Sequence, residues 1–278
     1  MSTLPATPTV SALTIAGSDS SGGAGLQADL RAFEALDVHG ATVVTLITAQ
    51  GTRGVRKVDA LRADLIRAQL DAVLEDMSPR AVKTGALGSA ACVEIVADVL
   101  RGRPELPLVL DPVINPTLGR TLLDEPGFVA FVRELLPLAT LVVPNRDEAV
   151  KLAGGTVKTA RQARAACQAI AGLGARAVLL KGGHFDGSES VDLFFDGRDF
   201  IELRAPRRKV PAMHGLGCTL SALITGLLAR GASLPEAVHR AHAILQHALG
   251  SPRSVGEGLK VLGGLRGSVA ATEPPCPT

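Results

Sequence analysis

The sequence is poor in aromatic residues. It has no tryptophan and no tyrosine, and phenylalanine alone supplies an aromatic share of 3% in 278 residues. Proteins that bind single-stranded nucleic acid usually stack the bases on exposed aromatic rings. Neither sign of charge dominates, because 29 basic residues nearly balance 27 acidic ones. We therefore expect neither nucleic acid nor a membrane surface as a partner.

Cysteine is also scarce, and its four positions lie far apart at Cys92, Cys167, Cys218 and Cys276. No CxxC pair and no Cys/His ligand spacing is present, which argues against a zinc site. Residues 1–10 lack the basic start and the apolar stretch of a secretory signal. The longest apolar runs are broken by glycine or charge, so none is expected to span a membrane. A reducing, cytoplasmic setting is expected.

The apolar share of 46% is enough for a full hydrophobic core and excludes wholesale disorder. The length fits one large domain or two small ones. Because no low-complexity linker interrupts the interior, we predict a single domain at 11–262. Flexible tails are predicted at 1–10 and, on account of its prolines, at 263–278.

Strand and helix patterns alternate along the chain. Short apolar runs predict strands at 11–16, 41–48, 80–83, 106–110, 140–143 and 177–180. Apolar residues at helical spacing predict helices at 26–36, 61–74, 89–100, 128–136, 146–152, 159–173, 218–228 and 235–249. A hairpin is predicted at 191–203. This alternation indicates an α/β fold with a mostly parallel sheet and helices on both faces.

Nearly every unusual cluster of residues follows a predicted strand. In parallel sheets, ligands bind beyond the carboxyl ends of the strands. The clusters lie at 17–25, 50–54, 83–88, 111–115, 145–148 and 181–184. The coincidence favours an enzyme that acts on a small molecule.

The strongest local motif is HGLGCTLS at 214–221. Gly215 and Gly217 let the backbone turn its N–H groups inward, and the start of the following helix adds partial positive charge. Together they predict an anion site suited to phosphate. Cys218 lies at this positive end, where a thiol pKa is expected to be lowered. The alternative is a glycine-rich turn followed by a small core cysteine.

A second glycine-rich segment spans 17–25. It matches neither GxGxxG nor GxxxxGK[ST], which excludes a dinucleotide fingerprint and a Walker phosphate loop. The segment either admits a ligand closely or only turns the chain. Asp29, one helical turn beyond, presents its carboxylate to a polar ligand or lies on a solvated helix face.

Other polar residues follow later strands. Asn145 and Glu148 share one face of a helix opening, an arrangement suited to hydrated Mg²⁺ beside phosphate, but a helix cap with an acidic first turn explains the same spacing. Lys181 either reaches a phosphate or lies on the surface. His184 and His214 are single loop histidines, for which no role is predicted.

Together these motifs resemble the ribokinase-like small-molecule kinases. Within them, the chain closely resembles the hydroxymethylpyrimidine/phosphomethylpyrimidine kinase family of thiamine biosynthesis. The resemblance spans about 11–250, and the segments that carry it lie at 13–30, 48–55, 83–88, 111–113, 143–149, 179–184 and 214–229.

The resemblance implies a three-layer α/β/α sandwich and an ATP- and Mg²⁺-dependent kinase. Its substrate would be 4-amino-5-hydroxymethyl-2-methylpyrimidine, and then the monophosphate of that compound. It also implies a homodimer. A pyridoxal or pyridoxine kinase on the same scaffold and a catalytically weak protein that binds vitamin precursors are the alternatives.

The resemblance also assigns site residues. Gly17, Asp29 and Gln50 match the pyrimidine pocket, with Val113 on its wall. The residues that match the ATP-phosphate and Mg²⁺ positions are Lys181, Asn145 and Glu148, with Glu148 nearest in role to a metal ligand. Cys218 matches the residue that replaces the aspartate base of the wider superfamily, and the backbone N–H groups of 215–218, including that of Leu216, match the anion hole.

The chain departs from the family pattern at several positions. Leu216 stands where the family usually has threonine, and Gly51 stands where it usually has asparagine. Ala86 and Ile114 replace frequent methionines, and the 115–119 segment differs. These changes bear on the rate and on the choice of substrate.

Overall fold

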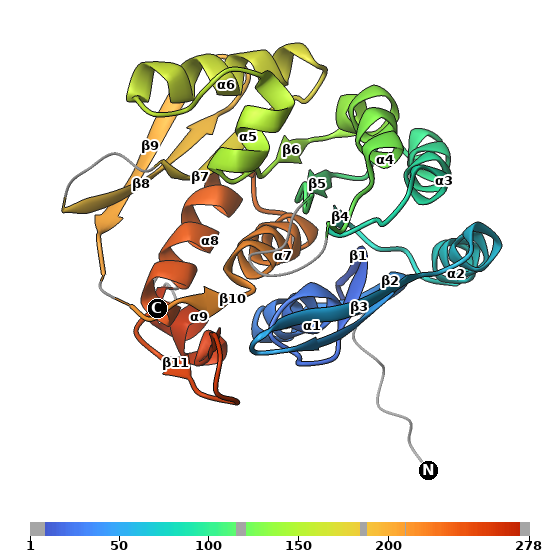
Figure 1. The fold of residues 1–278 in the computed structure, drawn as a ribbon, viewed down its shortest axis with the longest axis horizontal. Coiled ribbons are helices and arrows are strands. Elements are labelled where there is room, and N and C mark those ends of the chain that lie inside the picture. The colour runs from blue at the N-terminus through green and yellow to red at the C-terminus, as the bar shows by residue number, and fades with distance from the viewer. Residues whose placement is uncertain (1–8, 115–120, 184–187, 209, 273–278) are drawn as a thin grey trace, which may run out of the picture.

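The computed structural model describes residues 9–114, 121–183, 188–208 and 210–272. Within these ranges the chain forms a central nine-stranded sheet in the order β3-β2-β1-β4-β5-β6-β7-β8-β9 (Figure 1). The strands are β1 (Ser11–Asp19), β2 (His39–Gly51), β3 (Gly54–Ala60), β4 (Val82–Thr84), β5 (Leu108–Leu110), β6 (Leu141–Val142), β7 (Val178–Gly183), β8 (Glu189–Phe195) and β9 (Phe200–Pro206).

The six neighbouring strands β2, β1, β4, β5, β6 and β7 pair in parallel. β3 adds antiparallel to β2 at one edge, and the β8–β9 hairpin adds antiparallel to β7 at the other. The predicted mostly parallel sheet and the predicted hairpin are therefore confirmed.

Helices cover both faces of the sheet, as predicted for a three-layer sandwich. They are α1 (Gly25–Ala35), α2 (Ala63–Asp76), α3 (Ala90–Arg101), α4 (Glu125–Ala130), α5 (Arg146–Ala153), α6 (Ala160–Gly172), α7 (Leu216–Ala229), α8 (Leu234–Ala248) and α9 (Leu265–Thr272). Buried residues of α2 to α6 form one hydrophobic core with the sheet, and those of α1 and α7 to α9 form the other.

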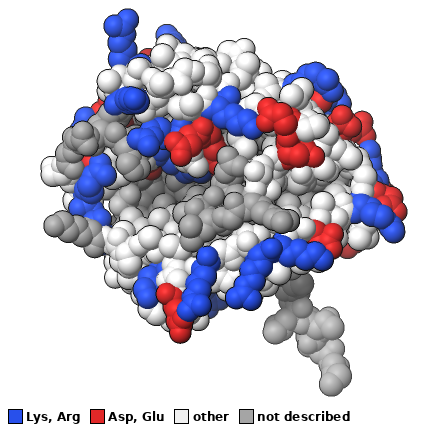
Figure 2. Space-filling view, in the orientation of Figure 1, with Lys and Arg blue, Asp and Glu red and all other residues white. Residues whose placement is uncertain are grey.

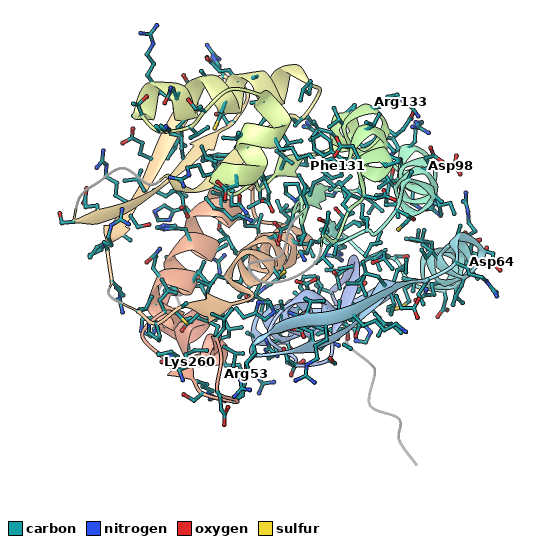
Figure 3. All side chains as sticks on the ribbon, in the orientation of Figure 1. Arg53, Asp64, Asp98, Phe131, Arg133 and Lys260 are labelled. Atoms are coloured by element: carbon teal, nitrogen blue, oxygen red, sulfur yellow. The ribbon has the colours of Figure 1, made fainter. Side chains whose placement is uncertain are left out.

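Alternation along a strand supplies both cores at once. Leu13 and Ile15 of β1 face the first core, and Ala12 of the same strand faces the second. Phe131, just beyond α4, is almost wholly buried in the first core (Figure 3). Charged side chains lie outside, and Figure 2 shows Lys and Arg interspersed with Asp and Glu over the face in view.

Proline and glycine determine where the chain leaves the sheet. β5 is followed by Asp111 and Pro112, and β6 is followed two residues later by Pro144. Proline has no N–H to continue a ladder. The polar residues beside these prolines are Asp111, just before Pro112, and Asn145, just after Pro144. They therefore lie at the carboxyl edge of the sheet.

α7 is a central helix of the fold. Apart from its first turn, nearly all of its residues are buried, as expected for a helix that is apolar on all sides. It contacts the helices α1 and α8 and the strands β1, β4 and β5. Its first turn therefore reaches the carboxyl edge of the sheet from within the molecule.

Strand β3 and a second, small sheet were not predicted. β3 is mostly exposed and charged, so its sequence lacks the apolar run of a buried strand. A second sheet is made of the very short strands β10 (Met213–His214), β12 (Lys260–Leu262) and β11 (Pro252–Arg253). Strands of two or three residues leave too little pattern to recognise.

The prediction of a flexible tail from 263 is wrong for residues 263–272. This segment contains α9, whose Leu265 and Val269 are one helical turn apart and buried in the second core. The prolines behind that prediction lie in 273–278, outside the described residues, as does most of the predicted N-terminal tail. No helix in the described ranges has the length and apolar character needed to cross a bilayer.

The docking of α9 can be measured through its buried valine. We expect Val269→Ala to lower the free energy of unfolding by about 1–3 kcal/mol, because a largely buried side chain is truncated. Urea unfolding gives the value. The exposed neighbour Ala270, changed to serine, is the control and should stay within about 0.5 kcal/mol of the parent. Equal stability of both variants would contradict the docked helix.

Candidate active site

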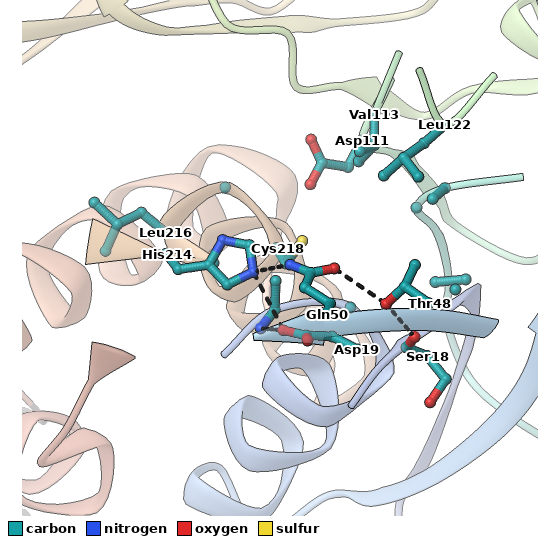
Figure 4. Close-up of a pocket in the computed structure, with 18 of the residues that line it drawn as sticks. Ser18, Asp19, Thr48, Gln50, Asp111, Val113, Leu122, His214, Leu216 and Cys218 are labelled. Carbon is teal, nitrogen blue, oxygen red and sulfur yellow. Dashed lines mark hydrogen bonds and ion pairs between the residues drawn. The ribbon is translucent and has the colours of Figure 1, made fainter. Parts of the chain in front are cut away.

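A cavity of about 500 Å³ opens where the carboxyl ends of the central strands meet the start of α7 (Figure 4). It collects residues from segments that are far apart in the sequence. The predicted site residues that line it are Gly17, Gln50, Val113, Asn145, Glu148, Lys181, Gly215, Leu216, Gly217 and Cys218. The structure therefore brings together every predicted site residue except one.

The exception is Asp29, which does not line the cavity. Its side chain is fully buried, and both of its carboxylate oxygens lie 2.8 Å from Nζ of Lys83. The hydroxyl of Thr14 donates a further hydrogen bond to Oδ2 at 2.7 Å. The prediction that Asp29 presents a carboxylate to the ligand is therefore wrong, because an internal cation occupies that carboxylate.

Lys83, the partner of Asp29, lines the cavity, whereas Asp29 does not. Burial tends to lower the pKa of Lys83, but the negative charge of Asp29 raises it above its ordinary value. The ammonium group is thus held charged beside the cavity, which it also lines. Its signal in the sequence is its place in β4, at the start of the 83–88 cluster, although that cluster predicts no role for the lysine itself.

The start of α7 forms a turn that only glycine fits. Gly215 has φ of +80°, in the left-handed region, and a Cβ there would overlap the carbonyl oxygen of Gly23. At Gly217 a Cβ would lie 3.0 Å from Nζ of Lys181. The first N–H groups of a helix have no acceptor within the helix. In α7 these groups belong to residues that line the cavity, as an anion site requires.

Lys181 is held in place by a buried carboxylate. Its Nζ lies 2.9 Å from Oδ1 of Asp111, and the hydroxyl of Ser221 donates to Oδ2 at 3.1 Å. Burial tends to lower the pKa of Lys181, but Asp111 and Glu148 raise it, so the side chain remains a cation. Asp111 was not predicted as a site residue, although its position directly after β5 was the available signal.

Asn145 and Glu148 form the helix cap that their spacing predicts, and they do so at the wall of the cavity. Oδ1 of Asn145 accepts from the Glu148 N–H at 2.9 Å, and Oε2 of Glu148 accepts from the Asn145 N–H at 2.8 Å, which caps α5. Both residues also line the cavity. Burial raises the pKa of Glu148 to about 7.

A dedicated metal cage is not part of this arrangement. The described part of the chain has no group of three or more His, Cys, Asp and Glu side chains placed to hold a metal ion. Mg²⁺ typically keeps several waters and binds through one or two carboxylates together with substrate phosphates. Glu148, with Asn145 beside it, fits that mode.

Cys218 does not have the lowered pKa that its position at a helix start predicts. Burial raises the pKa of its thiol to about 11, although the positive charge of Lys83 opposes the shift. The prediction considered the helix terminus alone, and removal of the sulfur from water has the larger effect.

His214 joins three strands that are far apart in the sequence. Its Nε2 lies 2.6 Å from Nε2 of Gln50 at the end of β2 and 3.2 Å from Oδ2 of Asp19 at the end of β1 (Figure 4). His214 and Asp19 both line the cavity. The two residues are 195 positions apart, so nothing in the local sequence indicated their pairing.

The raised pKa of Cys218 can be tested by alkylation of the ligand-free protein. On a Cys276→Ser background, we expect the rate of reaction with iodoacetamide at Cys218 to rise about tenfold for each pH unit from 7 to 10, because the thiolate fraction does so below the pKa. Mass analysis of the Cys218 peptide gives the rate, and N-acetylcysteine, which levels off near its ordinary pKa, is the reference. A plateau at or below pH 9 would show that the thiol is not shifted upward.

Comparison with known proteins gives one family. The sequence profile described as phosphomethylpyrimidine kinase matches residues 19–262. The hydroxymethylpyrimidine/phosphomethylpyrimidine kinase of Rhizobium meliloti is 48% identical over 246 residues, which cover 87% of this chain and 91% of that protein.

Solved structures share the fold. The ADP complex of Bacillus subtilis pyridoxal kinase has a TM-score of 0.84 and 34% identity, and the match covers 92% of this chain and 97% of that one. Phosphomethylpyrimidine kinase from Clostridium difficile has a TM-score of 0.76 and 38% identity, covering 86% of this chain and 99% of that one. The resemblance inferred from the motifs is confirmed, and the chain belongs to the phosphomethylpyrimidine kinase family, whose members are phosphotransferases with the ribokinase-like fold.

Proposed function

We propose that the protein transfers the terminal phosphoryl group of ATP to the hydroxymethyl oxygen of 4-amino-5-hydroxymethyl-2-methylpyrimidine. A second ATP then phosphorylates the monophosphate to the pyrophosphate, as a step of thiamine biosynthesis. One observation carries the proposal: a single cavity contains the amide of Gln50, the sulfur of Cys218 and the first turn of α7. A polar ring, its hydroxyl group and a phosphate therefore have separate partners within one site.

The ring end of the cavity suits a flat heterocycle. Leu46, Ala86 and Leu122 form a small apolar cluster there, with Val113 packed against it. At Gly17 a Cβ would lie 2.5 Å from a methyl carbon of Leu46, so this wall has no room for a larger side chain. Gln50 is the amide that reads the polar edge of the ring.

The phosphate end of the cavity carries positive charge, opposite to that of a phosphate. Phosphoryl transfer depends mainly on alignment and on neutralisation of the phosphate charge. Lys181, held by Asp111, supplies a fixed cation, and the backbone N–H groups of 215–218 surround the phosphoryl group as it is transferred. Glu148 and Asn145 would hold a hydrated Mg²⁺, whose charge offsets that of the triphosphate.

Cys218 is the proposed base. Its thiolate takes the proton of the hydroxyl group, whose oxygen forms a bond to the terminal phosphorus while the bond from that phosphorus to ADP breaks. Lys83 and the start of α7 favour the thiolate form and thus oppose the effect of burial.

Pyridoxal or pyridoxine kinase activity is the second candidate. It is favoured by the TM-score of 0.84 to Bacillus subtilis pyridoxal kinase, against 0.76 to the Clostridium difficile phosphomethylpyrimidine kinase. The higher sequence identity of 48% to the Rhizobium meliloti enzyme favours the pyrimidine.

We also propose that the protein acts in the cytoplasm as a homodimer. Ile47 of β2 and Leu65 of α2 are large apolar residues that are 51% and 46% exposed and line the same shallow surface depression. Such a surface beside an edge strand suits a second copy of the chain. Cys92 and Cys167 are free buried thiols, as expected in a reducing compartment.

A side-by-side assay tests the choice of substrate. With ATP and Mg²⁺, we expect ADP release to have a higher kcat/KM with the hydroxymethylpyrimidine than with pyridoxal or pyridoxine, and phosphorus NMR to show both the monophosphate and the pyrophosphate. A higher kcat/KM with either pyridine would favour the second candidate. Absence of ADP release with all three compounds would refute a kinase of this class.

A variant of Cys218 tests whether this residue is the base. We expect Cys218→Ala to lower kcat by about 10²–10⁴-fold, because proton transfer is lost, while calorimetry shows nearly unchanged affinity for the pyrimidine. Cys167→Ala, far from the cavity, is the matched control and should keep the parental kcat. Near-normal turnover in Cys218→Ala would exclude the thiolate as the base.

A further inference from the structure

We propose that Asp19 and His214 are positioning residues that fix the Gln50 amide with its oxygen toward α7, and that this orientation sets the direction in which the substrate ring binds. The second half of the proposal rests on the proposed function, whereas the first half concerns the ligand-free protein alone.

Asp19 is an acceptor at the centre of the glycine-rich loop. Its carboxylate accepts hydrogen bonds from the N–H groups of Ser21, Gly23 and Ala24 at 2.8–3.0 Å, and it is 4% exposed. Burial tends to raise the pKa of Asp19, but the hydrogen bonds from His214, Ser21 and Ala24 bring it below its ordinary value. The group is therefore an ionised carboxylate, which can only accept.

The carboxylate decides which nitrogen of His214 carries a proton. Nε2 of His214 lies 3.2 Å from Oδ2 of Asp19. A lone pair on that nitrogen would face the negative oxygen, so Nε2 carries the hydrogen, in the neutral or in the doubly protonated ring. The ring packs against the backbone of Gly23, where an added Cβ would lie 2.7 Å from its Cδ2.

The proton on His214 then decides how the Gln50 amide is turned. The amide atom that lies 2.6 Å from Nε2 of His214 must be an acceptor, and within the amide only Oε1 accepts. Figure 4 draws Nε2 at this place, where two donors would meet. A half-turn of the amide exchanges the two atoms and hardly changes the shape of the side chain.

The half-turn also satisfies the other end of the amide. The hydroxyl of Thr48 has one hydrogen, and the carbonyl oxygen of Ser18 at 3.0 Å accepts it. That hydroxyl therefore accepts from the amide atom of Gln50 at 3.1 Å, which must be Nε2. The donors run in one direction, from His214 to Gln50 to Thr48 to Ser18. Asp19 at 3.2 Å and the Gln50 amide at 2.6 Å share the one hydrogen on Nε2 of His214, whereas the hydrogen of the Thr48 hydroxyl has a single acceptor.

The fixed amide selects one direction for an aminopyrimidine. C4 of the substrate bears the amino group, and it lies between the ring nitrogen N3 and C5, which bears the hydroxymethyl group. Oε1 of Gln50 accepts from the amino group, and Nε2 donates to N3. Because Oε1 is on the His214 side, C5 and its hydroxymethyl group face the start of α7, where Cys218 lies.

The first test concerns the ligand-free protein. In ¹⁵N NMR of uniformly labelled protein, we expect Nε2 of His214 to show the shift of a protonated nitrogen and a coupling to its hydrogen. The resonance is assigned by its loss in His214→Gln. A shift typical of an unprotonated Nε2 would overturn the amide orientation, whatever the enzyme phosphorylates.

The second test compares two ligands by calorimetry, without turnover. One is the aminopyrimidine, and the other is its 4-oxo analogue, whose lactam form carries a carbonyl at C4 and an N–H at N3. The parent should bind the amino compound at least about tenfold more tightly, since the analogue opposes acceptor to acceptor and donor to donor.

Variants separate positioning from structural damage. In His214→Leu the amide keeps only its contact with Thr48, so the preference for the amino compound should fall to about threefold or less, whereas His214→Gln, which still offers an N–H, should retain most of it. An unchanged preference in His214→Leu would overturn the proposal. Failure of the parent to bind either compound would refute the proposed function and the ring direction with it, and the NMR result would still decide the amide orientation.

Discussion

The site depends on the close approach of two backbone segments that are almost two hundred residues apart. Gly215, directly before α7, lies against the carbonyl oxygen of Gly23 in the loop after β1. At the end of that loop, Gly25 lies against the carbonyl oxygen of Gly17. Both glycines have positive φ, so a side chain at either would meet a neighbouring backbone as well as an unfavourable conformation. This contact lets the ring end and the phosphate end share one cavity.

Buried charges make the cavity suitable for an anionic substrate before any ligand arrives. Lys83 is held by Asp29, which does not line the cavity, and Lys181 is held by Asp111, which lines the cavity together with the lysine. An ion pair that is already desolvated loses little further hydration when a phosphate displaces water nearby. The cost of burying these charges is met during folding, which leaves them fixed for binding.

Cys218 and His214, near the start of α7, show that the chemistry of a side chain depends on its surroundings in the fold more than on its position in the sequence. Local position gives Cys218 a helix terminus, yet burial controls the pKa of its thiol. Local position gives His214 no predicted role, yet contacts from the ends of β1 and β2 determine its hydrogen bonding. In both cases the chemistry follows from the groups that surround the side chain rather than from the motif that contains it.

The sequence alone determined the order of strands and helices, the parallel sheet and the edge at which ligands bind. These follow from apolar periodicity and from proline and glycine at strand ends, which act over a few residues. Gly215, Gly217 and Cys218, and the Asn145–Glu148 cap, were likewise accessible, because each set lies within one helix start. The charged strand β3 and the short helix α9 were not, since their patterns are weak without the surfaces that they cover.

Only the tertiary structure decided what the predicted polar residues face. Asp29 was expected at the ligand and is instead paired with Lys83, which is 54 residues away, and His214 meets Asp19 across 195 residues. Such pairs arise when separate strands end side by side, and no local pattern records which neighbours will meet. Desolvation is decided in the same way, because the water that a side chain loses depends on every element packed around it.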